Sequence, residues 1–413
     1  MNSDKNFFVN YSPKFFLTQV KIVIGLIFFS QLIASNFSFA QTHKATDTNF
    51  SLSPIERTFI LDSAALALDA VPLSITQFKS AYSEGGVNDF YSNGDYWWPD
   101  TQKENGLPFI LKDGQSNPNN FNAHREVMRN LTQVVGDLAS ASVLTGEAKY
   151  ALKANEMLSF FFLDSKTKMN PNLQFAQAIP GITPGRGVGV IDSLHLIEIP
   201  VAIEILSQNP AFSKTIHVGL RDWFKTYLHW MLNSKNGLDE SRAKNNHSVA
   251  FWLQVAVFAK FVGDDGAQQL AREQFKTKFM AEQMALDGSF PQELARTKPY
   301  GYSIFQLDNM AALCQVLSTP EDNLWTYETP DGKSMIKAVN FLAPFLKDKR
   351  KWPYKQDIQA FEGWPVRQPF LIFSASALNR SDLMELWHQL PMRIENEEVR
   401  RNVAILQPWL WLK

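Results

Sequence analysis

Residues 243–262 read AKNNHSVAFWLQVAVFAKFV. From position 248 onward the stretch is apolar almost all round at helical spacing, and Gln254 and Lys260 are its few polar interruptions. A helix that is hydrophobic on every side must be buried, and a glycine directly after it, here Gly263, is typical of a helix end. The stretch therefore predicts a helix in the interior of the protein, with three polar side chains just before it.

The rest of the chain has mainly the helical period as well. Residues 266–284 are amphipathic with one charged side, as expected of a helix that covers a buried one. The alternation of the two kinds predicts an all-α fold, an α/α toroid of concentric helical hairpins in a single domain over residues 41–413. Bundles and α-solenoids stay possible, although the sequence has no fixed-period repeat. The remaining predicted helices cover residues 60–71, 123–144, 150–162, 194–206, 217–232, 304–317, 334–346 and 375–390. Pro200 should kink or divide the helix in which it falls.

Composition excludes several classes of protein. The 413 residues hold 40 Lys and Arg against 41 Asp and Glu, so a broad basic surface for nucleic acid is not expected, and an anionic ligand needs a local cluster of donors. Cys314 is the single cysteine, which rules out an internal disulfide and any multi-cysteine metal site. Its apolar surroundings, MAALCQVL, predict a buried thiol.

The first 40 residues have the layout of a secretory signal peptide. Three lysines precede the apolar run IVIGLIFFSQLIA. The small residues Ser38 and Ala40 stand three and one positions before Gln41. We expect cleavage after Ala40, which predicts a periplasmic or secreted protein, from a Gram-negative bacterium, without a stable membrane anchor. A retained anchor is the alternative, but the run is shorter than the ~20 residues that span a membrane.

Long loops rich in Pro, Gly and aromatic residues separate the predicted helices. They cover residues 91–114, 178–193 and 351–369. Loops of this length are often functional, and their tryptophans are suited to stacking on sugar rings. The alternative is that these aromatic side chains only attach the loops to the helices.

Asn245, Asn246 and His247 stand where the buried helix should begin. Asparagine is favoured at a helix N-cap, which explains one of the two amides but neither the other nor the imidazole. A helix N-terminus also favours an anionic group. The motif therefore predicts either a capping structure or a site for a carboxylate.

A second group of polar residues lies in DGSFPQELARTKPYGYSIF, residues 287–305. Its two cations and two phenols are Arg296, Lys298, Tyr300 and Tyr302. Pro299 and Gly301 should break the helix and leave the tyrosines on an irregular segment. A tyrosine is a poor base until nearby cations favour the phenolate, and Arg296 or a protonated His247 could supply them. Glu293, one turn before Arg296, is expected to orient it through an ion pair; an ordinary surface loop is the alternative.

Together these motifs resemble the alginate lyase superfamily of α/α-toroid polysaccharide lyases. NNHS before an apolar helix, PQELAR at 291–296 and YSIF at 302–305 carry the resemblance. GDYWWPD (94–100), DSLHLIEIP (192–200) and FEGWPVRQP (361–369) extend it over most of the mature chain and make it most like polysaccharide lyase family 38.

The resemblance implies β-elimination on a 1,4-linked uronate polymer such as alginate, polymannuronate or glucuronan, without a metal or other cofactor. The implied catalytic group is Asn246, His247, Arg296 and Tyr302, with Tyr302 preferred over Tyr300 because it matches the Tyr-x-x-Phe pattern. Asn246 and Arg296 would neutralise the uronate carboxylate, and Tyr302 would protonate the leaving oxygen. The base would be Tyr302 where both groups leave from one face, and His247 where they leave from opposite faces.

Further residues are candidates for binding substrate. They are Asn245, Tyr300, Lys298, Arg367, Trp97, Trp98, Trp364 and His195, and His124 and Arg125 follow a loop that could reach the same cleft. The alternatives are a structural salt bridge for Arg367, a structural role for Asn245 and a polar contact in the inner wall for His195. His195 and Glu198 lie one turn apart, but two such side chains are too few to indicate a metal site.

Two other functions stay open at this point. A glycoside hydrolase on the same toroid would use two carboxylates, for which Asp287 and Glu293 are candidates. A periplasmic glycan-binding protein would have the cleft without turnover.

Overall fold

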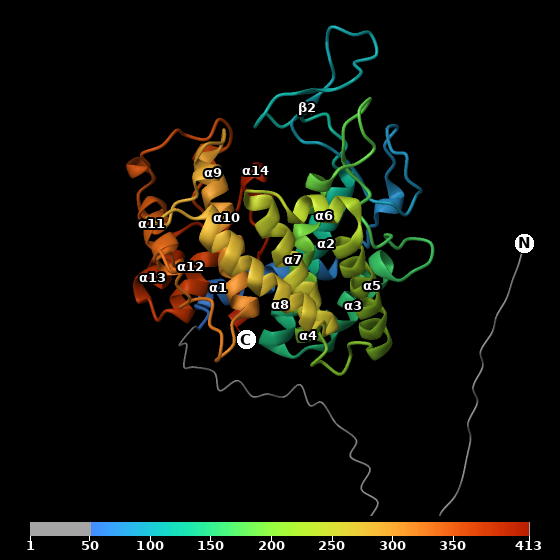
Figure 1. The fold of residues 1–413 in the computed structure, drawn as a ribbon. Coiled ribbons are helices and arrows are strands. Elements are labelled where there is room, and N and C mark those ends of the chain that lie inside the picture. The colour runs from blue at the N-terminus through green and yellow to red at the C-terminus, as the bar shows by residue number, and fades with distance from the viewer. Residues whose placement is uncertain (1–50, 413) are drawn as a thin grey trace, which may run out of the picture. The chain divides into compact units, whose positions relative to one another are not determined.

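Helices dominate the computed structural model, which describes residues 51–412 (Figure 1). The predicted signal peptide lies outside the described residues. In chain order the α-helices are α1 (Pro54–Leu68), α2 (Ala123–Thr145), α3 (Ala148–Phe162), α4 (Glu198–Leu206), α5 (Lys214–Asn233), α6 (Lys235–Ser241), α7 (Asn246–Val262), α8 (Asp265–Gln274), α9 (Pro291–Leu294), α10 (Pro299–Leu317), α11 (Met335–Lys347), α12 (Pro369–Ala377), α13 (Ser381–Gln389) and α14 (Glu397–Arg400). None of the helices in this described part is long and apolar enough to cross a membrane.

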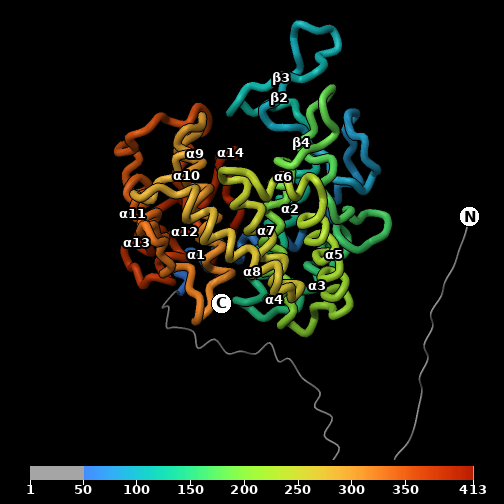
Figure 2. The backbone as a smooth tube through the Cα atoms, in the orientation of Figure 1, coloured from blue at the N-terminus to red at the C-terminus, as the bar shows by residue number. Residues whose placement is uncertain are grey.

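The longer helices form an inner and an outer layer. The inner helices α2, α4, α7, α10 and α12 follow one another around the molecule, with α4 joined to the 3₁₀ segment η2 (Gly187–Ile197). Helices α3, α5, α8, α11 and α13 pack on the outside of this series (Figure 2). The prediction of an all-α, α/α-toroid fold is confirmed.

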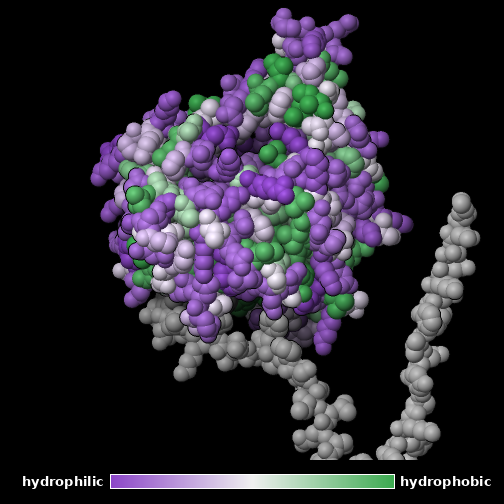
Figure 3. Space-filling view, in the orientation of Figure 1, coloured by the Kyte–Doolittle hydropathy of each residue, from purple (hydrophilic) through white to green (hydrophobic). Residues whose placement is uncertain are grey.

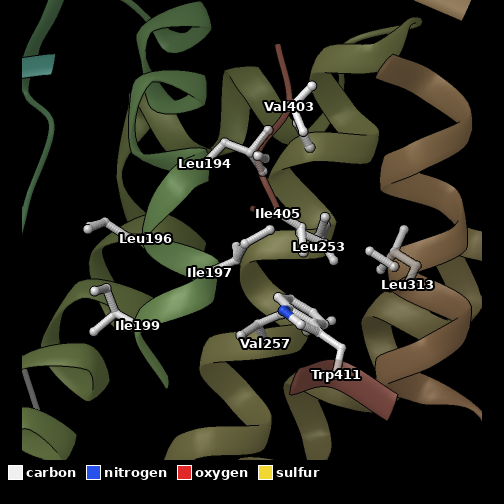
Figure 4. Packing of buried hydrophobic residues seen from close by; sticks show 14 of the residues in the cluster. Leu194, Leu196, Ile197, Ile199, Leu253, Val257, Leu313, Val403, Ile405 and Trp411 are labelled. Carbon is white, nitrogen blue, oxygen red and sulfur yellow. The ribbon is translucent and has the colours of Figure 1, made fainter. Parts of the chain in front are cut away.

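Helix α7 is the buried helix predicted from the opening stretch. Its residues from Ser248 to Ala259 are all buried, and Gly263 ends it in the left-handed conformation at a φ of 77°. Leu253 and Val257 of α7 face Ile405 and Trp411 of the C-terminal segment, which crosses the interior between η2 and α10 (Figure 4). Burial of one such side chain contributes about 1.5–3 kcal/mol to stability. These contacts therefore hold α7 in the interior, and with it the polar residues at its N-terminus.

One sequence prediction about helix boundaries is confirmed, and two need correction. Residues 194–206 are divided into η2 and α4, as Pro200 predicted, and the proline lies in the first turn of α4, where its missing N–H costs no hydrogen bond. Residues 375–390 are not one helix, because α12 ends at Ala377 and Asn379 adopts a left-handed φ of 52° before α13. Pro299 does not break α10; it starts it, so that both tyrosines lie in the first helical turn.

Short strands organise the long loops. Strand β1 (Tyr91–Asn93) pairs in parallel with β4 (Phe175–Ala178), and β2 (Trp97–Trp98) pairs antiparallel with β3 (Ile110–Leu111). The β2–β3 segment projects beyond the helices at the top of Figure 1. A Cβ atom at Gly189 would lie 2.5 Å from the carbonyl oxygen of Ala176 in β4, so this glycine lets the 178–193 loop pass closely against the strand. The loops are thereby held over the ends of α2, α7 and α10.

Candidate active site

A cleft of about 290 Å³ is lined by the loops at 95–113, by η2 and by the N-terminal ends of α7 and α10. Asn246, His247, Arg296 and Tyr302 all line it, although up to 56 positions separate them in sequence. Figure 3 shows a hollow below the projecting loop, surrounded by mostly hydrophilic residues. The structure therefore brings the four predicted catalytic residues together.

Asn246 is held by the carboxylate of Glu293. Its backbone N–H and its side-chain Nδ2 donate to the two oxygens of Glu293, over 2.8 and 2.6 Å. The predicted Glu293–Arg296 ion pair is wrong, because both carboxylate oxygens are used by Asn246. One N–H of the amide has no other partner among the described residues and is available to a ligand in the cleft.

His247 is paired with a buried carboxylate. Its Nδ1 lies 2.6 Å from Oε1 of Glu240, a carboxylate that is buried under the cleft wall. Burial alone would lower the pKa of His247, but Glu240 and, more weakly, Glu293 outweigh it and raise the pKa above its ordinary value. Since Nδ1 binds Glu240, the imidazole presents its Nε2–H side to the cleft.

Tyr302 is placed between a second phenol and a guanidinium. Its hydroxyl lies 2.5 Å from that of Tyr96, and Arg296 lies over its ring, 4.8 Å from the ring centre. Arg296 is held on its other side by Asp113 at 3.2 Å. Burial and Tyr96 raise the pKa of Tyr302 well above its ordinary value, although Arg296 and Arg401 act in the opposite direction. The expectation that cations would favour the phenolate in the free protein is therefore wrong: Tyr302 is a neutral phenol.

The sequence analysis did not identify Tyr96 or the ion-pair cluster beside it. Arg125 donates to Asp192 over 2.7 Å and to Asp95 over 2.5 Å, and Asp95 also accepts from Arg401. These contacts join α2, the loop before β2 and the C-terminal segment into one wall of the cleft. The motif GDYWWPD contains both Asp95 and Tyr96, but only its tryptophans were predicted to bind substrate.

Of the predicted substrate-binding residues, Trp97 and His195 line the cleft. Trp97 has Arg186 stacked over its ring at 5.8 Å. His195 is 7% exposed, and its Nε2 has no hydrogen-bond partner within the described chain. Their roles in binding stay predictions.

Tyr300 and Lys298 are not available to substrate, and the predictions for them are wrong. Tyr300 is fully buried against Trp352 and Phe361, and its hydroxyl donates to the carbonyl of Phe345 over 3.0 Å. Lys298 is buried in an ion pair with Glu398 at 2.5 Å. Both side chains hold the start of α10 in place.

Arg367 and Trp364 also lie outside the cleft. Arg367 forms an ion pair with Glu56 of α1 at 2.6 Å and stacks on Trp387, so it is a structural cation. Trp364 is buried and touches the position of Gly301 in α10. Neither contacts the cleft wall, and both predictions of substrate binding are wrong.

Asn245 and Trp98 border the cleft region without lining it. Asn245 is the N-cap residue of α7, but its side chain makes no capping hydrogen bond to any described residue. Trp98 donates from Nε1 to the carbonyl of Gln115 over 3.0 Å and has Lys112 over its ring. The loop-attachment alternative therefore describes Trp98 better than sugar stacking.

The geometry does not favour the hydrolase alternative. Glu293 is buried and fully used by Asn246, and Asp287 is exposed, outside the cleft, where it accepts from the backbone of Ser289. His124 binds the backbone of Tyr91 and Phe78 and is structural. In residues 51–412 no group of three or more His, Cys, Asp or Glu side chains is arranged to hold a metal ion.

Comparisons with known proteins agree with this geometry. The family model described as alginate lyase matches residues 74–352. The crystal structure of an alginate lyase from Bacteroides ovatus is similar with a TM-score of 0.73 and 32% identity, covering 86% of this chain and 94% of that one. Alginate lyase A1-III from Sphingomonas species A1, in a variant complexed with a tetrasaccharide, shares the fold at a TM-score of 0.52 and 16% identity, over 84% of this chain and 90% of that one.

No curated protein sequence matches the chain significantly. The finer resemblance to family 38 stays a prediction. The family match covers more than half of the chain, and the Bacteroides structure covers nearly all of its helical part. The chain belongs to the alginate lyase family and is a polysaccharide lyase.

Proposed function

We propose that the protein cleaves 1,4-linked uronate polymers at this cleft, and that mannuronate or glucuronate chains are its preferred substrates. The observation that supports the proposal most is the Tyr302 hydroxyl beside Arg296, in a cleft that Asn246 and His247 also line. The similar solved structures are named alginate lyases, and one is complexed with a tetrasaccharide, which favours an anionic polysaccharide as substrate.

Neutralisation of the uronate carboxylate is the first requirement of the reaction. Removal of the C5 proton moves negative charge onto the C6 carboxylate, so donors aimed at that group stabilise the transition state. Asn246, Arg296 and His247 supply an amide, a guanidinium and an imidazole with a raised pKa to the same cleft. Because Glu293 and Glu240 fix the amide and the imidazole, little reorganisation is needed when charge develops.

Tyr302 is the candidate for both proton transfers. It would take the C5 proton, the C–H electron pair would form the C4–C5 double bond, the C4–O4 bond would break, and the phenol would return its proton to O4. His247 is the weaker candidate for the base, because Glu240 binds its Nδ1 and raises its pKa, which favours the protonated form. Before it can act as a base, Tyr302 must lose its proton, and Arg296 and Arg401 are the groups that stabilise the phenolate.

A single residue that serves as base and acid selects substrates by stereochemistry. In mannuronate the C5 proton and O4 leave from the same face, and glucuronate has the same configuration at C4 and C5. Guluronate is the C5 epimer, so its C5 proton is on the other face. We therefore expect turnover of polymannuronate and glucuronan and slow turnover of polyguluronate.

The test is a panel of these three polymers, followed by the ultraviolet absorbance of the conjugated double bond that only a lyase creates. We expect absorbance to increase with the first two polymers. Reducing ends that accumulate without absorbance would contradict elimination, and equal rates on all three polymers would contradict a single acid–base tyrosine.

We also infer export from the N-terminal sequence, because its lysines, apolar run and small residues before Gln41 have the layout of a cleavable leader. N-terminal sequencing of the protein from a periplasmic fraction should begin at Gln41. A chain that retains Met1 and sediments with membranes would contradict the inference.

A further inference from the structure

Like Arg186, which donates to Gln177, Arg129 lines the cleft without an acidic partner among the described residues. It lies on α2 one turn after Arg125, so the two side chains share a face of the helix. Arg125 is saturated by two aspartates and the carbonyl of Asn93. Among residues 51–412, in contrast, Arg129 has no ion pair and no hydrogen bond, although it is half-buried in the cleft wall.

The surroundings of Arg129 differ from those of the reacting centre. Burial and the charges of Arg125 and Arg401 lower the pKa of Arg129, although Asp192 and Asp95 act in the opposite direction. Arg296 instead lies against Asp113, at 3.2 Å, and over the ring of Tyr302, at 4.8 Å from its centre. The two guanidinium groups therefore occupy different parts of one cleft.

An excess of positive charge remains around Arg129. Four guanidinium groups, those of Arg125, Arg129, Arg186 and Arg401, line the cleft, and the carboxylates beside them are Asp95, Asp192 and Glu398, the last of which pairs with Arg401. A half-buried guanidinium without a counter-ion is destabilising unless a ligand supplies the counter-ion. A carboxylate meets this need best because it can accept two parallel N–H bonds from one guanidinium.

His195 adds a second polar group at the same place. It is more than nine-tenths buried, lines the cleft, and its Nε2 is unpartnered within the described chain. The positive charge of Arg129 and burial keep this imidazole neutral, with a pKa lowered to about 3. A neutral imidazole nitrogen next to a guanidinium is suited to a hydroxyl group beside a carboxylate, which is the pattern of a sugar acid.

We propose that Arg129 binds the carboxylate of the uronate next to the one that reacts, so that the cleft recognises two consecutive acidic sugars. The proposal rests on the proposed function, since it needs a polyuronate in the cleft. It makes Arg129 a binding residue that contributes to affinity and to the minimum chain length, whereas Asn246 and Arg296 act on the reacting ring.

The test uses the full-length mature protein with Arg129→Gln, and Arg57→Gln as the control. Arg57 is an exposed arginine of α1, far from the cleft lining. With mannuronate oligomers we expect Arg129→Gln to raise KM at least tenfold and to change kcat less than threefold, and Arg57→Gln to change neither. Arg129→Lys should recover only part of the affinity, because an ammonium group cannot bind bidentately.

Binding measured without turnover distinguishes this proposal from the proposed function. In a Tyr302→Phe background, calorimetry should show at least tenfold weaker binding of a mannuronate tetramer when Arg129 is Gln. The same tetramer with its carboxyl groups reduced to alcohols should bind both proteins equally weakly.

Two negative results have different meanings. If the parent enzyme gives unsaturated products but Arg129→Gln has the parental KM and affinity, Arg129 does not bind the neighbouring uronate and the proposal is overturned. If the parent neither cleaves nor binds any uronate oligomer, the proposed function itself fails. Circular dichroism and thermal unfolding show whether Arg129→Gln has folded. If it has not, the KM and affinity of Arg129→Lys test the proposal in its place.

Discussion

Two cavities in the described part of the chain contain similar residues and differ in the contacts that those residues make. The α1 cavity, of about 470 Å³, is lined by residues of α1 and of the C-terminal segment, among them Glu56, Asp137, Arg367 and Arg400. It is larger than the cleft at Tyr302, which has about 290 Å³. In the α1 cavity Arg367 forms an ion pair with Glu56 and stacks on Trp387. In the cleft, Arg129 is unpaired within the described chain, and Arg296 and His247 are partly exposed.

The comparison teaches that the combination of side chains in a cavity, and not its volume, distinguishes the site. Desolvated donors without internal partners are costly to a folded protein unless a ligand uses them. The cations of the cleft are held by neighbours on one side only, as Arg296 is by Asp113 and His247 by Glu240. Substitutions in the cleft should therefore act on turnover, and substitutions in the α1 cavity on stability.

The largest effect is expected from Tyr302→Phe, with Tyr300→Phe as its matched control two positions away. Loss of the acid–base hydroxyl should reduce kcat on the order of 10³-fold and leave substrate affinity nearly unchanged. Tyr300→Phe loses one buried hydrogen bond to Phe345, so it should keep most of the activity and lose about 1 kcal/mol of stability. Similar losses of kcat in both variants would mean that the choice of phenol is wrong.

A smaller loss of turnover is expected from Asn246→Ala. The amide supplies one donor to the developing carboxylate charge, and removal of one such donor costs about 10²–10³ in kcat. Glu293→Gln should reduce kcat as well, because it replaces one acceptor of the Asn246 donors by a donor. Steady-state kinetics on polymannuronate measures both. An unchanged kcat in Asn246→Ala would remove the amide from the reacting centre.

The sequence predicted the scaffold and the reacting group better than it predicted the surrounding contacts. Apolar periodicity identified α7, and local motifs identified the two segments that meet at the cleft. Periodicity does not tell which phenol of α10 faces outward: Tyr300 and Tyr302 are two residues apart and so point to different sides of the helix. Pairs such as Arg367 with Glu56 join positions 311 apart, and local sequence gives no signal for contacts of that range.

In the α1 cavity, Arg367→Met should affect stability alone. The variant leaves Glu56, which is buried, without its arginine, and the loss of a charged hydrogen bond is expected to lower the free energy of unfolding by roughly 2 kcal/mol. Urea denaturation measures this change, and initial rates on polymannuronate should stay within twofold of the parent. A large loss of kcat at unchanged stability would instead make Arg367 part of the substrate path.

The smallest effect is a pH dependence of stability that originates beside the α1 cavity. Burial raises the pKa of Glu198 to about 8 and that of Asp137 to about 7, and Gln407 bonds to both carboxyl groups. The folded protein therefore holds protons that the unfolded chain has lost, so this contribution to stability is full below about pH 4 and disappears as the pH rises towards 8.

The measurement is the Tm between pH 5 and pH 9, which should fall by several degrees. Glu198→Gln keeps the shape of the side chain and should flatten part of the decrease, whereas Glu126→Gln, an exposed control on α2, should not. A Tm that increases over this range would contradict the buried, protonated carboxyl groups.

The central claim is that one sugar ring bridges the N-terminus of α7 and the first turn of α10. A crystal structure of Tyr302→Phe with a mannuronate oligomer tests it most directly. The account predicts a C6 carboxylate within hydrogen-bond distance of Asn246 and Arg296, with C5 and O4 of that ring both facing the aromatic ring at position 302. A carboxylate bound away from both donors, or a ring whose C5 proton faces His247 instead, would contradict it.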